Sequence, residues 1–190
     1  MSAVLVTGSI DTSYGPLHLA VVVGDHTPVS ALANASTVDG PAAPSEPVVV
    51  ASGWTDLAEL LSRVDPVVAA LPTDDAALPA PIVAAVRSWD SGDATALDAI
   101  AVVQPGAQFR QRVWTELRTV PAGRVVTYGE LAALAGNPKA ARAAGSACAT
   151  NVVAPFVPCH RVVQAGGRVG HYAYGSDLKS RMLATERAAI

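Results

Sequence analysis

Two helix signals follow each other in the second half of the chain, and they constrain the fold more than any other feature. Thr127 and Glu130 have the spacing of a capping box, in which each side chain satisfies a free amide at a helix start. Gly136 is placed to end that helix, and Asn137-Pro138 is a favoured start for a second helix that reaches about residue 149. The pattern therefore predicts a helix-turn-helix arrangement.

The second of these helices is rich in alanine and carries essentially one long cation, Arg142. A helix that reads base edges usually offers several Asn, Gln, Arg or Ser side chains. A face of small residues instead allows close approach to a surface, and a protruding Arg142 would then suit sequence-independent binding with nucleotide extrusion. The alternative is a packed helix with one solvated charge.

The segment 158–163, Pro-Cys-His-Arg-Val-Val, is the main candidate for chemistry. Cys159 is followed by a base, His160, and by a permanent cation, Arg161, and both neighbours favour the nucleophilic thiolate. On an extended backbone the side chains of Cys159 and His160 would point to opposite sides. The other cysteine is Cys148, and because the sequence supplies no cluster of metal ligands, we expect neither a metal nor a cofactor.

The fold class predicted from the whole chain is α+β. We expect a strand-rich N-terminal domain at 1–90, a linker at 91–108, and a mostly helical DNA-binding domain at 109–190. The remaining expected elements are strands at 3–7 and 17–23, a loop at 40–47, helices at 54–63 and 79–89, a helix at 109–120 and a final helix at 178–188. Thr55 or Ser52 is the candidate cap of the helix at 54–63.

Charge is divided unevenly along the chain. Residues 1–104 hold twelve acidic and two basic residues, whereas residues 105–190 hold eleven basic and four acidic ones. This asymmetry favours a polyanion as the partner of the C-terminal part, the alternatives being chance or mutual attraction of the halves. The sequence has no apolar run of about 18 residues and no evident signal peptide, and its two cysteines suit a reducing compartment. We therefore expect a cytoplasmic protein that does not enter membranes.

An ordered set of motifs from about residue 109 to residue 186 resembles the O6-alkylguanine-DNA alkyltransferases, also called methylated-DNA–protein-cysteine methyltransferases. The N-terminal part resembles this family only loosely. The motifs are Phe109-Arg-Gln-Arg-Val-Trp114, Gly123-Arg-Val-Val-Thr-Tyr128-Gly-Glu, Gly136-Asn-Pro-Lys-Ala-Ala-Arg142, Asn151, Pro158-Cys-His-Arg-Val162, Gly170-His-Tyr172 and Lys179 with Glu186.

The resemblance implies a single-use repair reaction in which the O6-alkyl group of a flipped guanine in double-stranded DNA moves to Cys159. His160 would take the thiol proton through a water, Glu186 would steady His160, and Asn151 would orient the turn before Cys159. Tyr128 would contact the flipped guanine and assist its departure. Whether copies associate side by side along DNA stays open.

The resemblance also implies residues for binding. Arg142 would occupy the vacated place in the duplex, on a helix face that includes Ala141 and Gly145. The guanine pocket would include the backbone of Val162 and Ala173, together with Tyr172 and Lys179. Two departures from the family pattern are Ala173, which lacks a hydroxyl found in some members, and Tyr174, which adds bulk where glycine is common.

Three other functions remain open at this point. A cysteine hydrolase using Cys159 and His160 would turn over repeatedly, but it leaves the helix-turn-helix pattern unexplained. A non-enzymatic DNA sensor is disfavoured because alkyltransferase-like proteins carry Trp where this chain has Cys159. A transcription regulator related to this family would be expected to carry further cysteines in a metal-binding domain, and this sequence lacks them.

Overall fold

The structure, a computed structural model, describes residues 2–25 and 46–189. The loop predicted at 40–47 therefore lies almost entirely outside the described residues. The chain forms two compact units. Unit 1 consists of Met1–Gly106 and Val152–Phe156, and unit 2 consists of Ala107–Asn151 and Val157–Ile190. A sheet in unit 1 and a mainly helical unit 2 confirm the predicted α+β class.

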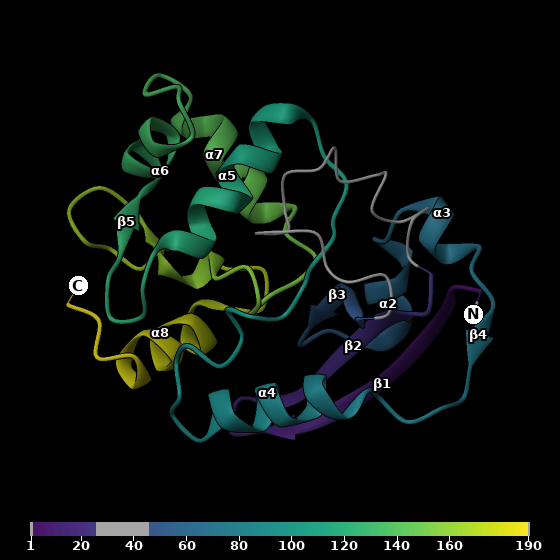
Figure 1. The fold of residues 1–190 in the computed structure, drawn as a ribbon. Helices are drawn as coiled ribbons and strands as arrows, with labels where there is room; N and C mark the ends of the chain where they lie inside the picture. The colour runs from purple at the N-terminus through teal and green to yellow at the C-terminus, as the bar shows by residue number, and fades with distance from the viewer. Residues whose placement is uncertain (1, 26–45, 190) are drawn as a thin grey trace. The chain divides into compact units, whose positions relative to one another are not determined.

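Unit 1 is built on a four-stranded sheet with the order β3-β2-β1-β4, drawn in purple and blue in Figure 1. β1 and β2 form an antiparallel hairpin in which Thr12 is paired with Gly15 across a tight turn. Gly15 has a φ of 108°, a conformation that glycine adopts without strain. Both predicted strands are confirmed and are longer than expected. The strands are β1 Val4–Thr12, β2 Gly15–Val23, β3 Val48–Gly53 and β4 Thr73–Asp74.

In the part of unit 1 that the structure describes, three helices accompany this sheet: α2 Leu57–Ser62, α3 Pro66–Ala69 and α4 Ala80–Asp90. The predicted cap of α2 was wrong. Asp56 directly precedes the helix, and its carboxylate accepts a hydrogen bond from the Glu59 amide at 2.9 Å. Thr55 donates its hydroxyl to the Glu59 side chain instead, and Ser52 is buried in β3.

Two segments beyond the first strands complete unit 1. The Val49 amide donates to the Ala101 carbonyl at 2.9 Å and the Val103 amide donates to the Val49 carbonyl at 3.0 Å, so part of the stretch expected as a linker pairs with β3. The Ser52 amide donates to the Val152 carbonyl at 2.7 Å. The chain thus returns to unit 1 just before the cysteine motif.

Unit 2 contains α5 Gln108–Thr119, α6 Tyr128–Leu134, α7 Ala141–Ala149 and α8 Ser176–Thr185, shown from teal through green to yellow in Figure 1. Two short strands, β5 Val126–Thr127 and β6 Val162–Val163, pair in parallel. This pairing ties the start of α6 to the end of the cysteine motif. No helix in the described parts of the chain is long and apolar enough to span a bilayer.

The helix-turn-helix prediction is confirmed in outline, with one boundary corrected. Thr127 and Glu130 form the complete capping box of α6, and Gly136, with a φ of 83°, follows its end. However, α7 begins at Ala141 and not at Pro138. The side chain of Asn137 accepts a hydrogen bond from the Lys139 amide at 3.3 Å, so it closes a local turn instead of capping the helix.

Candidate active site

The cysteine motif, expected as an active-site loop, folds as a turn of 3-10 helix, Cys159–Arg161, and its backbone is not extended at Cys159 and His160. The Cys159 amide donates to the Val157 carbonyl and the Arg161 amide to the Pro158 carbonyl, each at 2.9 Å. These local hydrogen bonds tighten the chain. With three residues per turn, the side chains of Cys159 and His160 diverge by roughly 120°, so they still point in different directions.

The Cys159 thiol is buried, with 6% of the residue exposed, and its main polar neighbour is Asn151. The Asn151 side chain donates from Nδ2 to the Val157 carbonyl at 2.8 Å and to Cys159 Sγ at 3.1 Å. Burial raises the pKa of the Cys159 thiol, and the Asn151 hydrogen bond and the charge of Lys179 oppose this rise. The thiol therefore needs a base to react readily near neutral pH.

His160, Arg161 and Glu186 form a buried cluster beside the cysteine. His160 Nε2 lies 3.0 Å from Glu186 Oε1, and His160 Nδ1 is buried without a hydrogen-bond partner among the described residues. Burial lowers the pKa of His160, which favours the neutral ring. Although burial raises the pKa of Glu186, hydrogen bonds from His160 and Arg161 bring it to about 2. A neutral ring with a free nitrogen can accept a proton.

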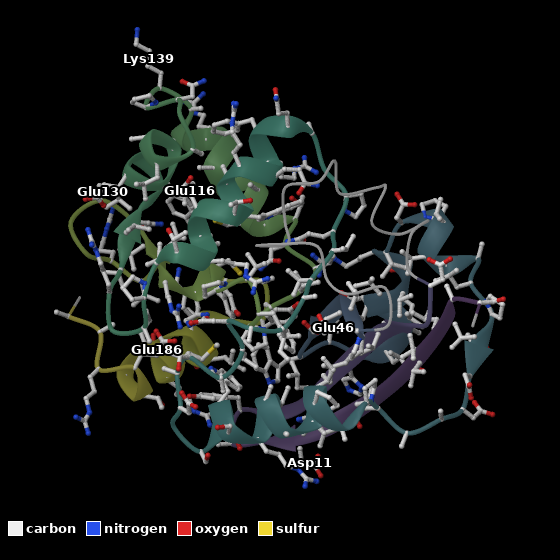
Figure 2. The ribbon with its side chains drawn as sticks, viewed as in Figure 1. Asp11, Glu46, Glu116, Glu130, Lys139 and Glu186 are labelled. Carbon is white, nitrogen blue, oxygen red and sulfur yellow. The ribbon has the colours of Figure 1, made fainter. Side chains whose placement is uncertain are left out.

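Arg161 has a different role from the one expected from the sequence. Its Nη2 atom donates to Glu186 Oε1 at 2.8 Å and its Nη1 atom donates to the Val120 carbonyl at 2.6 Å. Its guanidinium therefore pairs with Glu186 and with a backbone carbonyl. The side chains that lower the pKa of the Cys159 thiol are Asn151, Lys179 and Tyr172 instead. Figure 2 shows Glu186 at the end of α8.

A cavity of about 320 Å³ opens onto the thiol. Among the residues predicted for the site, Tyr128, Gly145, Cys159, Tyr172 and Ala173 line it. The sequence analysis missed three other lining residues, which are Cys148, Ala149 and His171. Two of these follow Gly145 by three and four positions on α7, so helical spacing from Gly145 could have identified them.

Other predicted site residues lie elsewhere in unit 2. Ala141 and Arg142 form the first turn of α7, where Arg142 is exposed. Val162 and Lys179 are fully buried, and the Lys179 ammonium donates to the Val162 carbonyl at 2.5 Å. Lys179 therefore supports the backbone after Cys159 and does not line the cavity. No group of three or more metal-binding side chains occurs among the described residues.

Comparison with known proteins shows which proteins the region around this site resembles. Residues 108–188 match the family model described as "6-O-methylguanine DNA methyltransferase, DNA binding domain". The chain is similar to the solved structure of Mycobacterium tuberculosis OGT in complex with DNA, with a TM-score of 0.67 and 28% identity over 96% of this chain and 94% of that one. Residues 108–188 therefore form the DNA-binding domain of the O6-alkylguanine-DNA alkyltransferase family.

Curated alkyltransferases match mainly the C-terminal half of the chain. The methylated-DNA–protein-cysteine methyltransferase of Methanosarcina acetivorans is 40% identical over 101 residues, which are 53% of this chain and 64% of that protein. The human methylated-DNA–protein-cysteine methyltransferase is 49% identical over 85 residues, 45% of this chain and 41% of that protein. The chain thus matches less than two thirds of the length of these relatives, and every site residue predicted above lies within 108–188.

Proposed function

We propose that this alkyltransferase repairs DNA by moving the O6-alkyl group of guanine onto Cys159. The observation that carries the proposal is the position of the thiol, which faces a cavity beside a neutral histidine held by a buried carboxylate. This arrangement supplies a nucleophile, a base and space for a flipped base.

The chemistry is a displacement at the alkyl carbon. The Cys159 sulfur forms a bond to that carbon while the bond from carbon to guanine O6 breaks, and the electron pair returns to the base. His160 Nδ1 accepts the thiol proton through a water, because the two side chains diverge. The product is a thioether, which water does not readily cleave, so each protein molecule reacts once.

Tyr128 is placed to help the guanine leave. It belongs to the first turn of α6 and lines the cavity, and burial raises the pKa of its phenol above the usual value of 10.0. The group therefore remains a hydrogen-bond donor at neutral pH. A donor aimed at the departing base stabilises the charge that develops on it.

The surface around α7 suits a DNA partner. Arg142 is exposed at the start of α7, near a face formed by small residues such as Ala141 and Gly145. Lys139 projects outward from the loop between α6 and α7, as Figure 2 shows. We infer that phosphates bind near this loop, that Arg142 replaces the extruded base, and that the lesion is O6-alkylguanine in a duplex.

Lengthening the duplex and measuring the number of bound copies by sedimentation tests side-by-side association.

The deciding experiment mixes the full chain with a duplex that contains O6-methylguanine and follows both products by mass spectrometry. We expect one methyl group on the peptide that contains Cys159 and an equal amount of repaired guanine. Cys159→Ala should remain unmodified. The matched control, Cys148→Ala, lacks the other thiol of the cavity and should still be methylated at Cys159. An unmethylated Cys159 beside an intact lesion would refute the proposal.

A further inference from the structure

Two thiols face the same cavity in unit 2. Cys148 on α7 and Cys159 in the 3-10 turn are the chain's two cysteines, both are free, and both line this cavity. The reaction proposed above uses Cys159 alone. The proposed alkyl transfer therefore gives the Cys148 thiol no role.

Asn151 connects the two cysteines. Its amide donates to the Cys148 carbonyl at 3.3 Å, and its side-chain Nδ2 donates to Cys159 Sγ at 3.1 Å. The other α7 residues that line the cavity, Gly145 and Ala149, have little or no side chain. Burial raises the pKa of the Cys148 thiol, and the charge of Cys159 raises it further, as expected for groups that interact across one cavity.

Tyr172 supplies an independent observation. Its hydroxyl is buried and makes no hydrogen bond of ordinary geometry among the described residues, but it lies close enough to the Cys159 thiol for each group to shift the pKa of the other. Sulfur is a weak acceptor, so a thiol satisfies such a donor poorly. An oxygen atom attached to the sulfur would accept from Tyr172 and from Asn151 much better. An oxygen atom on the Cys159 sulfur would therefore have two candidate donors, Asn151 and Tyr172.

We propose that Cys148 is the resolving thiol for Cys159, so that oxidation by a hydroperoxide ends in a reversible disulfide between them. In the first step the Cys159 sulfur attacks one peroxide oxygen, the O–O bond breaks, and the leaving hydroxide takes the thiol proton to form water. In the second step the Cys148 sulfur attacks the sulfenic sulfur, the S–O bond breaks, and the oxygen leaves as water with the Cys148 proton. Two thiols and one hydroperoxide thus give one disulfide and two molecules of water, or water and an alcohol for an organic hydroperoxide.

The disulfide would preserve a thiol that can be used only once. Without a partner, a sulfenic acid is oxidised further to sulfinic acid, which common thiol reductants do not reverse. With Cys148 nearby, the oxidised protein is inactive but recoverable. The disulfide itself does not depend on the DNA substrate, whereas its value as regulation rests on the proposed function.

The test treats the full chain with hydrogen peroxide, blocks the remaining thiols, and analyses unreduced peptides by mass spectrometry. We expect the intact oxidised protein to keep the mass of a monomer. Its peptides should be joined through Cys148 and Cys159, and dithiothreitol should break this link. In Cys148→Ser and Cys148→Ala the linked pair should be absent, and sulfinic acid should accumulate at Cys159. The alkyl-accepting capacity of each protein is normalised to its own value before oxidation.

The expected result is that dithiothreitol restores nearly all of the wild-type capacity and only a small part of that of either variant. Sulfinic acid at Cys159 of the wild type without a linked pair would overturn the proposal. Linkage between separate molecules, or equal recovery in the variants, would overturn it as well. A protein that forms the linked pair but never accepts an alkyl group would refute the proposed function alone.

Discussion

The Nε2 atom of His160 lies 3.0 Å from the Oε1 atom of Glu186, and both side chains are almost completely buried. A carboxylate only accepts hydrogen bonds, so the proton of the neutral imidazole is held on Nε2 and the lone pair is left on Nδ1. Arg161 donates to the same carboxylate from Nε and Nη2 and keeps it ionised. One glutamate thus fixes the tautomer of the base and neutralises a buried cation.

Removing the negative charge of Glu186 should destabilise unit 2. In Glu186→Gln the buried Arg161 keeps its charge without a counterion, and breaking a buried pair in this way costs about 3–5 kcal/mol. We expect a loss of this order in the free energy of unfolding, measured by urea denaturation at pH 7. Glu116→Gln removes a carboxylate from another part of unit 2 and should change stability by less than about 0.5 kcal/mol.

The same carboxylate predicts a dependence of stability on pH. The pKa of Glu186 falls from the ordinary 4.5 to about 2 in the folded protein, so its contribution is complete above about pH 4.5 and disappears as the pH falls toward 2. The depression corresponds to roughly 3 kcal/mol. Urea denaturation from pH 6 downward should therefore show a steep loss in the wild type and a shallower one in Glu186→Gln. Parallel curves would contradict the assignment.

The reactivity of Cys159 should depend on His160. Because burial lowers the pKa of His160, the ring is neutral at pH 7 and accepts the thiol proton, and because burial raises the pKa of Cys159, the thiol reacts slowly without that base. We expect His160→Asn to slow alkyl transfer from a free O6-alkylated guanine at pH 7 by about 100-fold, within the usual range for a general base. The wild-type rate should fall as acid protonates the ring. His18→Asn in β2 is the matched control, and an unchanged rate in His160→Asn would contradict the role.

Asn151 should influence both the thiol and the turn before it. In Asn151→Ala the Val157 carbonyl and the Cys159 sulfur lose a donor, so we expect a loss of about 1–3 kcal/mol in stability and a higher thiol pKa. Asn151→Asp places a negative charge beside the thiolate and should raise that pKa further. The rate of iodoacetamide labelling against pH measures the thiol pKa, and Asn137→Ala in an exposed turn is the control. A lower pKa in either variant would contradict this account.

The sequence predicted those elements whose causes are local. The capping box of Thr127 and Glu130 involves residues three apart, and the strands predicted at 3–7 and 17–23 rest on local runs of strand-forming residues. The capping box and both strands were therefore predicted correctly, although the strands are longer than expected. The start of α7 was predicted wrongly because Asn137 can close a turn or cap a helix, and the two signals look alike in sequence.

The site depends more on contacts between distant segments. Glu186 was placed beside His160 through the family resemblance, but nothing in the sequence indicated that Arg161 would donate to the same carboxylate and to the Val120 carbonyl. The 3-10 turn at Cys159 was also unexpected, since its hydrogen bonds join neighbouring backbone groups and need no particular side chain. Burial decided the rest, because the Cys159 thiol has a raised pKa once it is removed from water, although His160 and Arg161 follow it in the sequence.

Arg142 provides the final prediction, which separates base extrusion from alkyl transfer. Arg142 is exposed at the start of α7 and does not line the cavity, so Arg142→Ala should leave the reaction with a free alkylated base within about twofold of the wild type. Repair of a duplex should slow by about tenfold or more, because nothing then fills the space left by the extruded base. Arg181→Ala on α8 removes the same charge elsewhere and should affect neither rate. Single-turnover measurements on both substrates decide the question, and equal slowing on the two would remove Arg142 from extrusion.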